Sequence, residues 1–178
     1  MKRTMIGTFV LGVLASATPA MAQDSETFTV QTEVPAYCSQ FTVGPAPMNL
    51  GGLTGTSGQI LPAFASGSET ERQLATNLYC NAPSTVSIKA EPLMHDTITV
   101  VTDSTSFTNR VDYTATVKWN TIEGSSSSSS ANPVVLSATQ PTIGALTLKV
   151  ASPAVTNNLR PVAGNYAGQV RLTIALAQ

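Results

Sequence analysis

The chain has one histidine, one tryptophan and few charged side chains, which make up 11% of its 178 residues. Nucleophilic hydrolysis needs a base beside the nucleophile, and His95 is the only histidine that could serve. Because His95 follows Pro92 closely, we interpret it as an exposed turn residue. No serine lies in a Gly-x-Ser-x-Gly motif. The composition therefore argues against an enzyme, although paired carboxylates for glycoside chemistry stay open.

Clusters of metal ligands and phosphate-binding motifs are also missing from the sequence. Zinc and haem sites need grouped Cys and His residues, and calcium loops need dense Asp and Asn residues. We therefore expect no cofactor and no metal. Nucleic-acid binding needs a basic surface. This chain has a formal net charge of −1, so nucleic acid is not an expected partner.

Long apolar runs are absent except at the N-terminus. There Lys2 and Arg3 precede an uncharged run over 5–17, and Ala20-Met21-Ala22 forms a small-x-small cleavage site. This order predicts a cleavable signal peptide over 1–22. A membrane anchor is the alternative, but about 13 apolar residues fall short of the roughly 20 that a span needs. We expect an exported protein with no membrane span after cleavage.

Cysteine is scarce, and both copies, Cys38 and Cys80, lie in the mature part. An even number of cysteines in an exported chain predicts a disulfide. A metal site or a redox pair is the alternative, but the two residues form no Cys-x-x-Cys motif. The bridge would contribute about 4 kcal/mol in the chain-entropy treatment.

Alternation of apolar and polar residues dominates the remainder and predicts β-strands. It is clearest over 111–119 and 164–178, and it recurs over 85–89 and 146–150, while 97–101 is rich in β-branched residues. Loops rich in Gly, Pro, Asn and Ser separate these runs, among them a serine stretch over 125–130 that we expect to be flexible and solvated. Several short strands between such loops predict an all-β sandwich or barrel.

Aromatic residues are few, and two of them, Tyr113 and Trp119, lie on the apolar side of one predicted strand. Such residues are normally core. A carbohydrate-binding platform is the alternative interpretation for them.

The segment 23–36 stands apart as an N-terminal arm before the first cysteine. Its residues 27–34 alternate, and Pro35 ends the pattern. The apolar side of this strand-forming arm carries four residues: Phe28, Val30, Thr32 and Val34.

Several motifs together resemble the pilin-like subunits of archaic chaperone-usher systems, the group with spore-coat-protein-U-like domains. They are the arm before Cys38, a short strand expected over 39–43, the Leu78-Tyr79-Cys80-Asn81 run, and Asp112-Tyr113-Thr114-Ala115. The most specific is the terminal motif over 163–174, in which Gly168 stands where the family usually has Asp. The resemblance spans nearly the whole mature chain.

The resemblance implies an immunoglobulin-like, pilin-type antiparallel sandwich over 37–178 that lacks one strand. It also implies partners: a periplasmic chaperone, an outer-membrane usher and homologous pilin subunits. The chain would pass through the periplasm and become part of a cell-surface fibre. The arm would insert into a neighbour by β-strand addition. The acceptor groove would be lined by four residues of the last strand: Val170, Leu172, Ile174 and Leu176.

A self-contained exported β-sandwich that binds a glycan or a surface protein is the second hypothesis. An aromatic patch outside the core, with Trp119 or Tyr79 exposed, would favour it.

Overall fold

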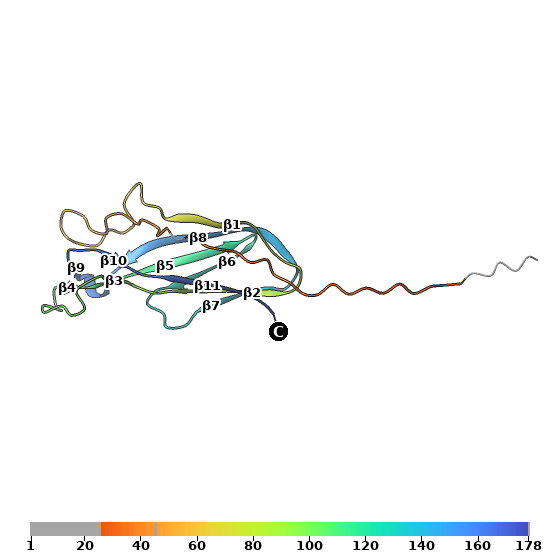
Figure 1. Ribbon diagram of the computed structural model, residues 1–178. Coiled ribbons are helices and arrows are strands. Elements are labelled where there is room, and N and C mark those ends of the chain that lie inside the picture. The colour runs from red at the N-terminus through yellow and green to blue at the C-terminus, as the bar shows by residue number, and fades with distance from the viewer. Residues whose placement is uncertain (1–25, 45, 178) are drawn as a thin grey trace, which may run out of the picture. The chain divides into compact units, whose positions relative to one another are not determined.

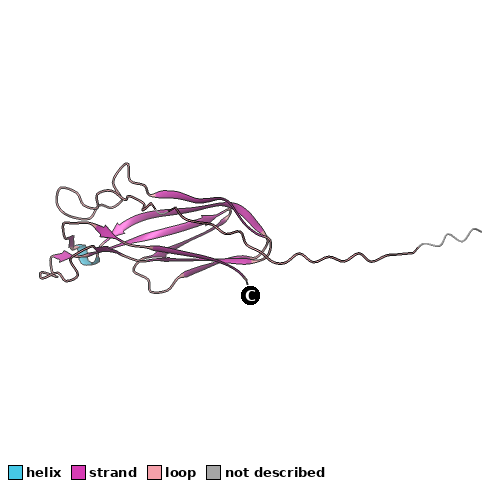
Figure 2. Ribbon diagram, in the orientation of Figure 1, coloured by secondary structure: helices cyan, strands magenta, loops and turns pink. Residues whose placement is uncertain are grey.

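The computed structural model describes residues 26–44 and 46–177, and the predicted signal peptide lies outside them. The chain divides into two units, Met1–Val34 and Pro35–Gln178. The described part of the first unit forms neither helix nor strand, so the strand expected over 27–34 is not formed within the chain. The second unit is built from strands (Figures 1 and 2), with a single 3-10 turn at Thr156–Asn158 among its described residues.

The larger sheet has the order β1-β8-β5-β3-β10, and β6 also pairs with β5. Its pairings are all antiparallel. The long strands alternate between buried and less buried residues, because one face packs on the core. The strands are β1 Glu71–Cys80, β3 Leu93–His95, β5 Arg110–Trp119, β6 Ile122–Ser127, β8 Thr142–Ala154 and β10 Tyr166–Ala167.

The smaller sheet has the order β11-β2-β7, again antiparallel. It is built from β2 Ser84–Ala90, β7 Val134–Ala138 and β11 Val170–Leu176. β2 packs across β5 and β6 of the larger sheet. The two antiparallel sheets therefore form a sandwich-like arrangement, as predicted.

The core lies between the sheets and is aliphatic apart from Cys80 and two aromatic residues, Tyr113 and Trp119. Trp119 is 1% exposed and donates its indole N–H to the Leu78 carbonyl at 3.1 Å. The interpretation of both aromatic residues as core is confirmed. Burial of side chains this large supplies much of the hydrophobic stabilisation of a small domain.

The predicted disulfide is present, and Cys38 and Cys80 also form an isolated antiparallel bridge. The strand expected over 39–43 is wrong, because no ladder continues beyond that bridge. Prolines at 45 and 47, which lack a backbone N–H, follow directly.

The strand expected over 97–101 is also wrong. The backbone there bonds to side chains in place of a neighbouring strand: the Asn109 amide donates to the carbonyls of Ile98 and Thr99, both at 2.9 Å. The preceding residues Leu93–His95 form the strand instead.

The expectation that the serine stretch over 125–130 is a flexible, solvated connection is also wrong. Ile122–Ser127 is strand β6, and Ser126 and Ser128 are buried. Their hydroxyl groups accept backbone N–H groups of Ala90 at 3.2 Å and Tyr113 at 2.9 Å, respectively. These bonds let small polar residues occupy the interior at little cost.

A short parallel pair, β4 Phe107–Thr108 with β9 Arg160–Pro161, completes the domain. Figure 1 shows β3, β4, β9 and β10 gathered at one end of the sandwich, opposite the end at which β1 finishes and β2 begins.

Candidate functional site

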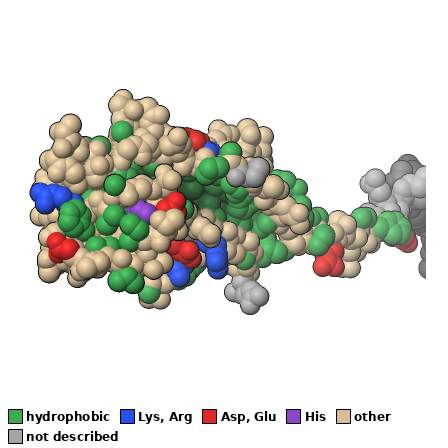
Figure 3. Space-filling view, turned by 60° about the vertical axis from the view of Figure 1, so that its left-hand side comes forward, with side chains coloured by type: hydrophobic (Ala, Val, Ile, Leu, Met, Phe, Trp, Pro, Cys, Tyr) green, Lys and Arg blue, Asp and Glu red, His purple; other side chains and the backbone are tan. Residues whose placement is uncertain are grey.

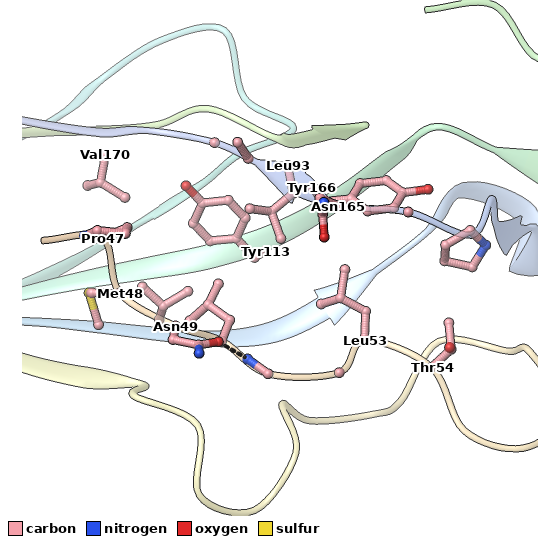
Figure 4. A pocket seen from close by; sticks show the side chains of 18 of the residues that line it. Pro47, Met48, Asn49, Leu53, Thr54, Leu93, Tyr113, Asn165, Tyr166 and Val170 are labelled. Carbon is pink, nitrogen blue, oxygen red and sulfur yellow. Dashed lines mark hydrogen bonds between the residues drawn. The ribbon is translucent and has the colours of Figure 1, made fainter. Parts of the chain in front are cut away.

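A groove of about 950 Å³ opens on the domain beside the start of β11. It is lined by the segment 47–54, by side chains of β3, β5 and β8, and by the segment 161–168 that leads to Val170. Figure 4 shows Met48 and Leu53 on one side of it and Leu93, Tyr113 and Val170 on the other. In Figure 3 hydrophobic side chains line a hollow on the visible face. The site is suited to an apolar, extended ligand.

One wall of the groove, the segment 46–50, is held by side chains rather than by a strand ladder. Arg72 donates to the carbonyls of Ala46 and Pro47 at 2.5 and 3.0 Å, and the Ser68 hydroxyl donates to the Leu50 carbonyl at 2.6 Å. Arg72 also pairs with Glu69, and this hydrogen bond lowers the pKa of the Glu69 carboxyl. The wall is therefore fixed to β1 through Arg72 and to the loop before β1 through Ser68.

Tyr113 lies in the groove and ties it to the chain just before β11. Its hydroxyl donates to the Gln169 carbonyl at 3.1 Å. Burial, and then the negative charge of Glu91, raise the pKa of Tyr113 to about 12. The phenol is therefore neutral at physiological pH and acts as a hydrogen-bond donor.

His95 is buried on β3, at the end of the sandwich where β3, β4, β9 and β10 gather (Figure 1). Its interpretation as an exposed turn residue is therefore wrong. Its Nδ1 accepts the backbone N–H groups of Thr97 and Ile98 at 3.2 and 3.0 Å, which leaves Nε2 as the ring nitrogen that donates. Nε2 then donates to the Ala163 carbonyl at 3.1 Å. Both ring nitrogens are occupied by backbone groups, so the ring has a structural role here.

Two glycines of the terminal motif allow the chain to approach β3 closely. A Cβ at Gly164 would lie 2.1 Å from Nε2 of His95, and φ there is 151°. A Cβ at Gly168 would lie 2.8 Å from the Pro92 carbonyl oxygen. Backbone rather than a mobile side chain blocks the second position, so any side chain there would require the backbone to shift.

The predicted acceptor row lies on β11, which is an edge strand. β11 pairs in register with β2, and the other edge of β11 forms no ladder within 46–177. Three members of the row, Val170, Leu172 and Ile174, are only partly buried although they pack against the core. Val170 alone lines the groove; the other members of the row continue along the free edge beyond it.

The predicted donor row is exposed. Phe28, Val30 and Val34 are 80%, 92% and 77% exposed, and Thr32 is exposed as well. Contiguous exposed apolar surface, unlike single scattered side chains, is typical of interaction sites.

An exposed aromatic pair lies at the disulfide end of the domain. The rings of Tyr37 and Tyr79 are 5.8 Å apart between centroids, and both side chains are exposed. Trp119, the other candidate for such a patch, is in the core.

Sequence reasoning missed the residues that form most of the groove, because 47–54 and 161–168 are loops without periodicity. The Pro47-Met48 and Leu50-Gly51-Gly52-Leu53 runs were the only signal: apolar residues within a loop rich in glycine and proline.

No family model, curated protein or solved structure matches this chain, so the site is interpreted from its own geometry. Within 26–44 and 46–177, no group of three or more Cys, His, Asp and Glu residues could hold a metal. The same residues include no helix with the length and hydropathy of a membrane span.

Proposed function

We propose that this chain is a structural subunit of a bacterial surface fibre, a pilus or fimbria, and that it polymerises by donor-strand addition. The N-terminal arm of one subunit enters the groove of the next and pairs with the free edge of β11. The observation that carries the proposal is this free edge, with its partly buried apolar row and the groove at its start.

The sizes of the two elements support the match. β11 has seven residues, Val170–Leu176, and the alternating part of the arm from Phe28 to Val34 also has seven. Each segment places four alternate side chains on one side, so the added strand would cover the whole β11 row. An uncovered strand edge is an aggregation hazard, which a chaperone strand would cover before assembly.

Export fits the same scheme. Cleavage after Ala22 would free the arm as the new N-terminus, so removal of the signal peptide would precede assembly. The expected partners are a periplasmic chaperone, an outer-membrane usher and further copies or homologues of this subunit. Head-to-tail insertion does not close, so it generates an open fibre.

The test is whether the full chain, produced in a host with its own export machinery, forms oligomers that resist SDS and dissociate on heating. We expect Val30→Asp to abolish them, because a charge would have to pack against the apolar row of β11. The matched control is Gln31→Asp, on the opposite side of the arm, which should leave them intact. Monomers from the wild-type chain, stable and complete without a partner strand, would refute the proposal.

A second variant separates accepting from donating a strand. Val170→Glu introduces a charge at the groove, so this subunit should fail to accept an arm but should still donate its own to wild-type subunits. The emission of Trp119, the single tryptophan, reports whether the variant folds.

The alternative function, a self-contained exported sandwich that binds a glycan or a surface protein, is favoured by one observation: the exposed Tyr37–Tyr79 pair. Exposed aromatic rings can stack on sugar rings. Glycan-array binding that Tyr79→Ala abolishes, by a chain that stays monomeric, would favour this function over the fibre.

A further inference from the structure

Hydrogen bonds hold the chain at the point where the arm leaves the domain. The Asn81 side chain accepts the N–H of Tyr37 at 2.6 Å and donates to the Pro35 carbonyl at 2.9 Å, while its backbone N–H donates to the Tyr37 carbonyl at 3.0 Å. The Cys38–Cys80 disulfide fixes the next residue. The chain is therefore anchored from Pro35 onward, and proline itself restricts the backbone at the boundary.

This anchor leaves almost no linker. If Phe28 to Val34 inserts into a neighbour, as the proposed function requires, Val34 is directly followed by the anchored Pro35. One residue spans at most about 3.6 Å, so the two domains must abut where the arm enters the groove. A freely jointed fibre is excluded by this length.

Three exposed apolar side chains lie around the exit. Tyr37 and Tyr79 lie against each other, and Ile143, the cross-strand partner of Tyr79 in β8, is 61% exposed. Two exposed apolar side chains lie at the opposite end of the domain, where β3 and β4 are found in Figure 1. Val100, in the segment that joins those two strands, is 81% exposed, and Phe107 of β4 is also exposed.

The direction of insertion decides which surfaces meet. β11 pairs with β2 in antiparallel register, and antiparallel pairs are the more stable kind. An antiparallel arm would place Val34 beside Val170, at the end of the acceptor that carries Val100 and Phe107. The exit surface of the donor then faces that end.

We propose that Tyr37, Tyr79 and Ile143 of one subunit form a contact with Val100 and Phe107 of the subunit that receives its arm. The partner is a second copy of this chain, and the contact fixes the angle between successive domains. This inference rests on the proposed function, but it concerns a different surface from the groove. A heterologous contact of this kind repeats along an open fibre.

The test is crosslinking in assembled fibres. The double variant Ile143→Cys with Val100→Cys carries one thiol on each surface, and a short bis-maleimide should convert its oligomers into a covalent ladder that survives heating in SDS. The matched control is Val135→Cys with Val100→Cys, because Val135 is 58% exposed but lies on β7 of the other sheet. Tethering raises the local concentration of apposed groups, so we expect roughly tenfold more ladder from the first pair.

The outcomes separate the two proposals. Heat-labile, SDS-resistant oligomers with equal or weaker crosslinking of the Ile143 pair would overturn the contact and leave the fibre function standing. Absence of such oligomers from the wild-type chain would overturn both. The emission of Trp119 checks that each variant is folded.

Discussion

His95 and Tyr166 pack edge to face, with ring centroids 5.2 Å apart and planes at 73°. They are also backbone partners in the β3–β10 ladder. The Tyr166 hydroxyl lies 2.9 Å from the Val162 carbonyl and 3.2 Å from the Thr108 carbonyl, so this ring connects three parts of the domain. The pair therefore fixes the end of the groove at which the segment 161–168 turns toward β11.

Gly164→Ala should disturb this end of the domain. A methyl group there would collide with Nε2 of His95 and would force alanine into an unfavourable backbone conformation, since φ is 151°. We expect a loss of about 1–3 kcal/mol in the free energy of unfolding. Urea denaturation followed by Trp119 emission measures it. Gly52→Ala, with no heavy atom within 4 Å of the new Cβ, should change the stability little; equal effects of both substitutions would contradict the packing argument.

Stability should fall at high pH because of Tyr113. Its pKa is about 12 in the folded state against an ordinary value of 10, so the folded domain holds this proton more tightly than the unfolded chain. The stabilisation is complete below pH 10 and is lost as the pH rises toward 12, by up to about 2–3 kcal/mol.

Tyr113→Phe provides the comparison. The variant loses the hydrogen bond to Gln169, so we expect it to be less stable at neutral pH, and that difference should shrink between pH 10 and 12. Urea denaturation of both proteins at pH 8 and pH 11.5 measures the change. A difference that stays constant over this range would show that the Tyr113 proton is not held by folding.

Alternation was sufficient to predict the strands whose two faces differ in polarity. β5 and β11 follow the predicted rows closely, because each places apolar residues at every second position toward the core. Alternation did not predict β6. Its buried residue Ser126 is a serine, and it contributes to stability through a hydrogen bond rather than through buried apolar area.

For the arm, alternation predicted a strand that the chain does not form by itself. The pattern from Phe28 to Val34 is clear, although no strand is present there. A strand needs a partner for its backbone, and sequence alone does not say whether that partner is in the same chain.

The environment of His95 could not be predicted from the sequence either. Its partners include Ala163, far along the chain, and the N–H groups of a segment whose β-branched residues predicted a strand.

Ser128→Ala should lower the stability of the domain, although Ser128 lies in a run of serines. The Ser128 hydroxyl accepts the Tyr113 N–H at 2.9 Å and donates to Asp112 at 2.8 Å, and the side chain is buried. Its removal leaves a buried N–H without a partner, so we expect a loss of about 1–3 kcal/mol. The control is Ser129→Ala, an exposed neighbour that should cost little. Thermal unfolding of the two variants is compared side by side, and similar midpoints would contradict the contribution of the Ser128 hydrogen bonds to stability.

Loss of the disulfide should lower the stability of the domain and loosen the backbone at the exit of the arm. The double variant Cys38→Ser with Cys80→Ser opens a loop of about 40 residues, and the chain-entropy treatment gives a loss of about 4 kcal/mol. The exit of the arm also loses its covalent anchor, although the Asn81 hydrogen bonds remain. Under conditions in which the variant is still folded, we therefore expect amide exchange of residues 37–39 to accelerate more than that of β5. Uniform acceleration of both regions would mean that the bridge stabilises the domain as a whole without fixing the exit.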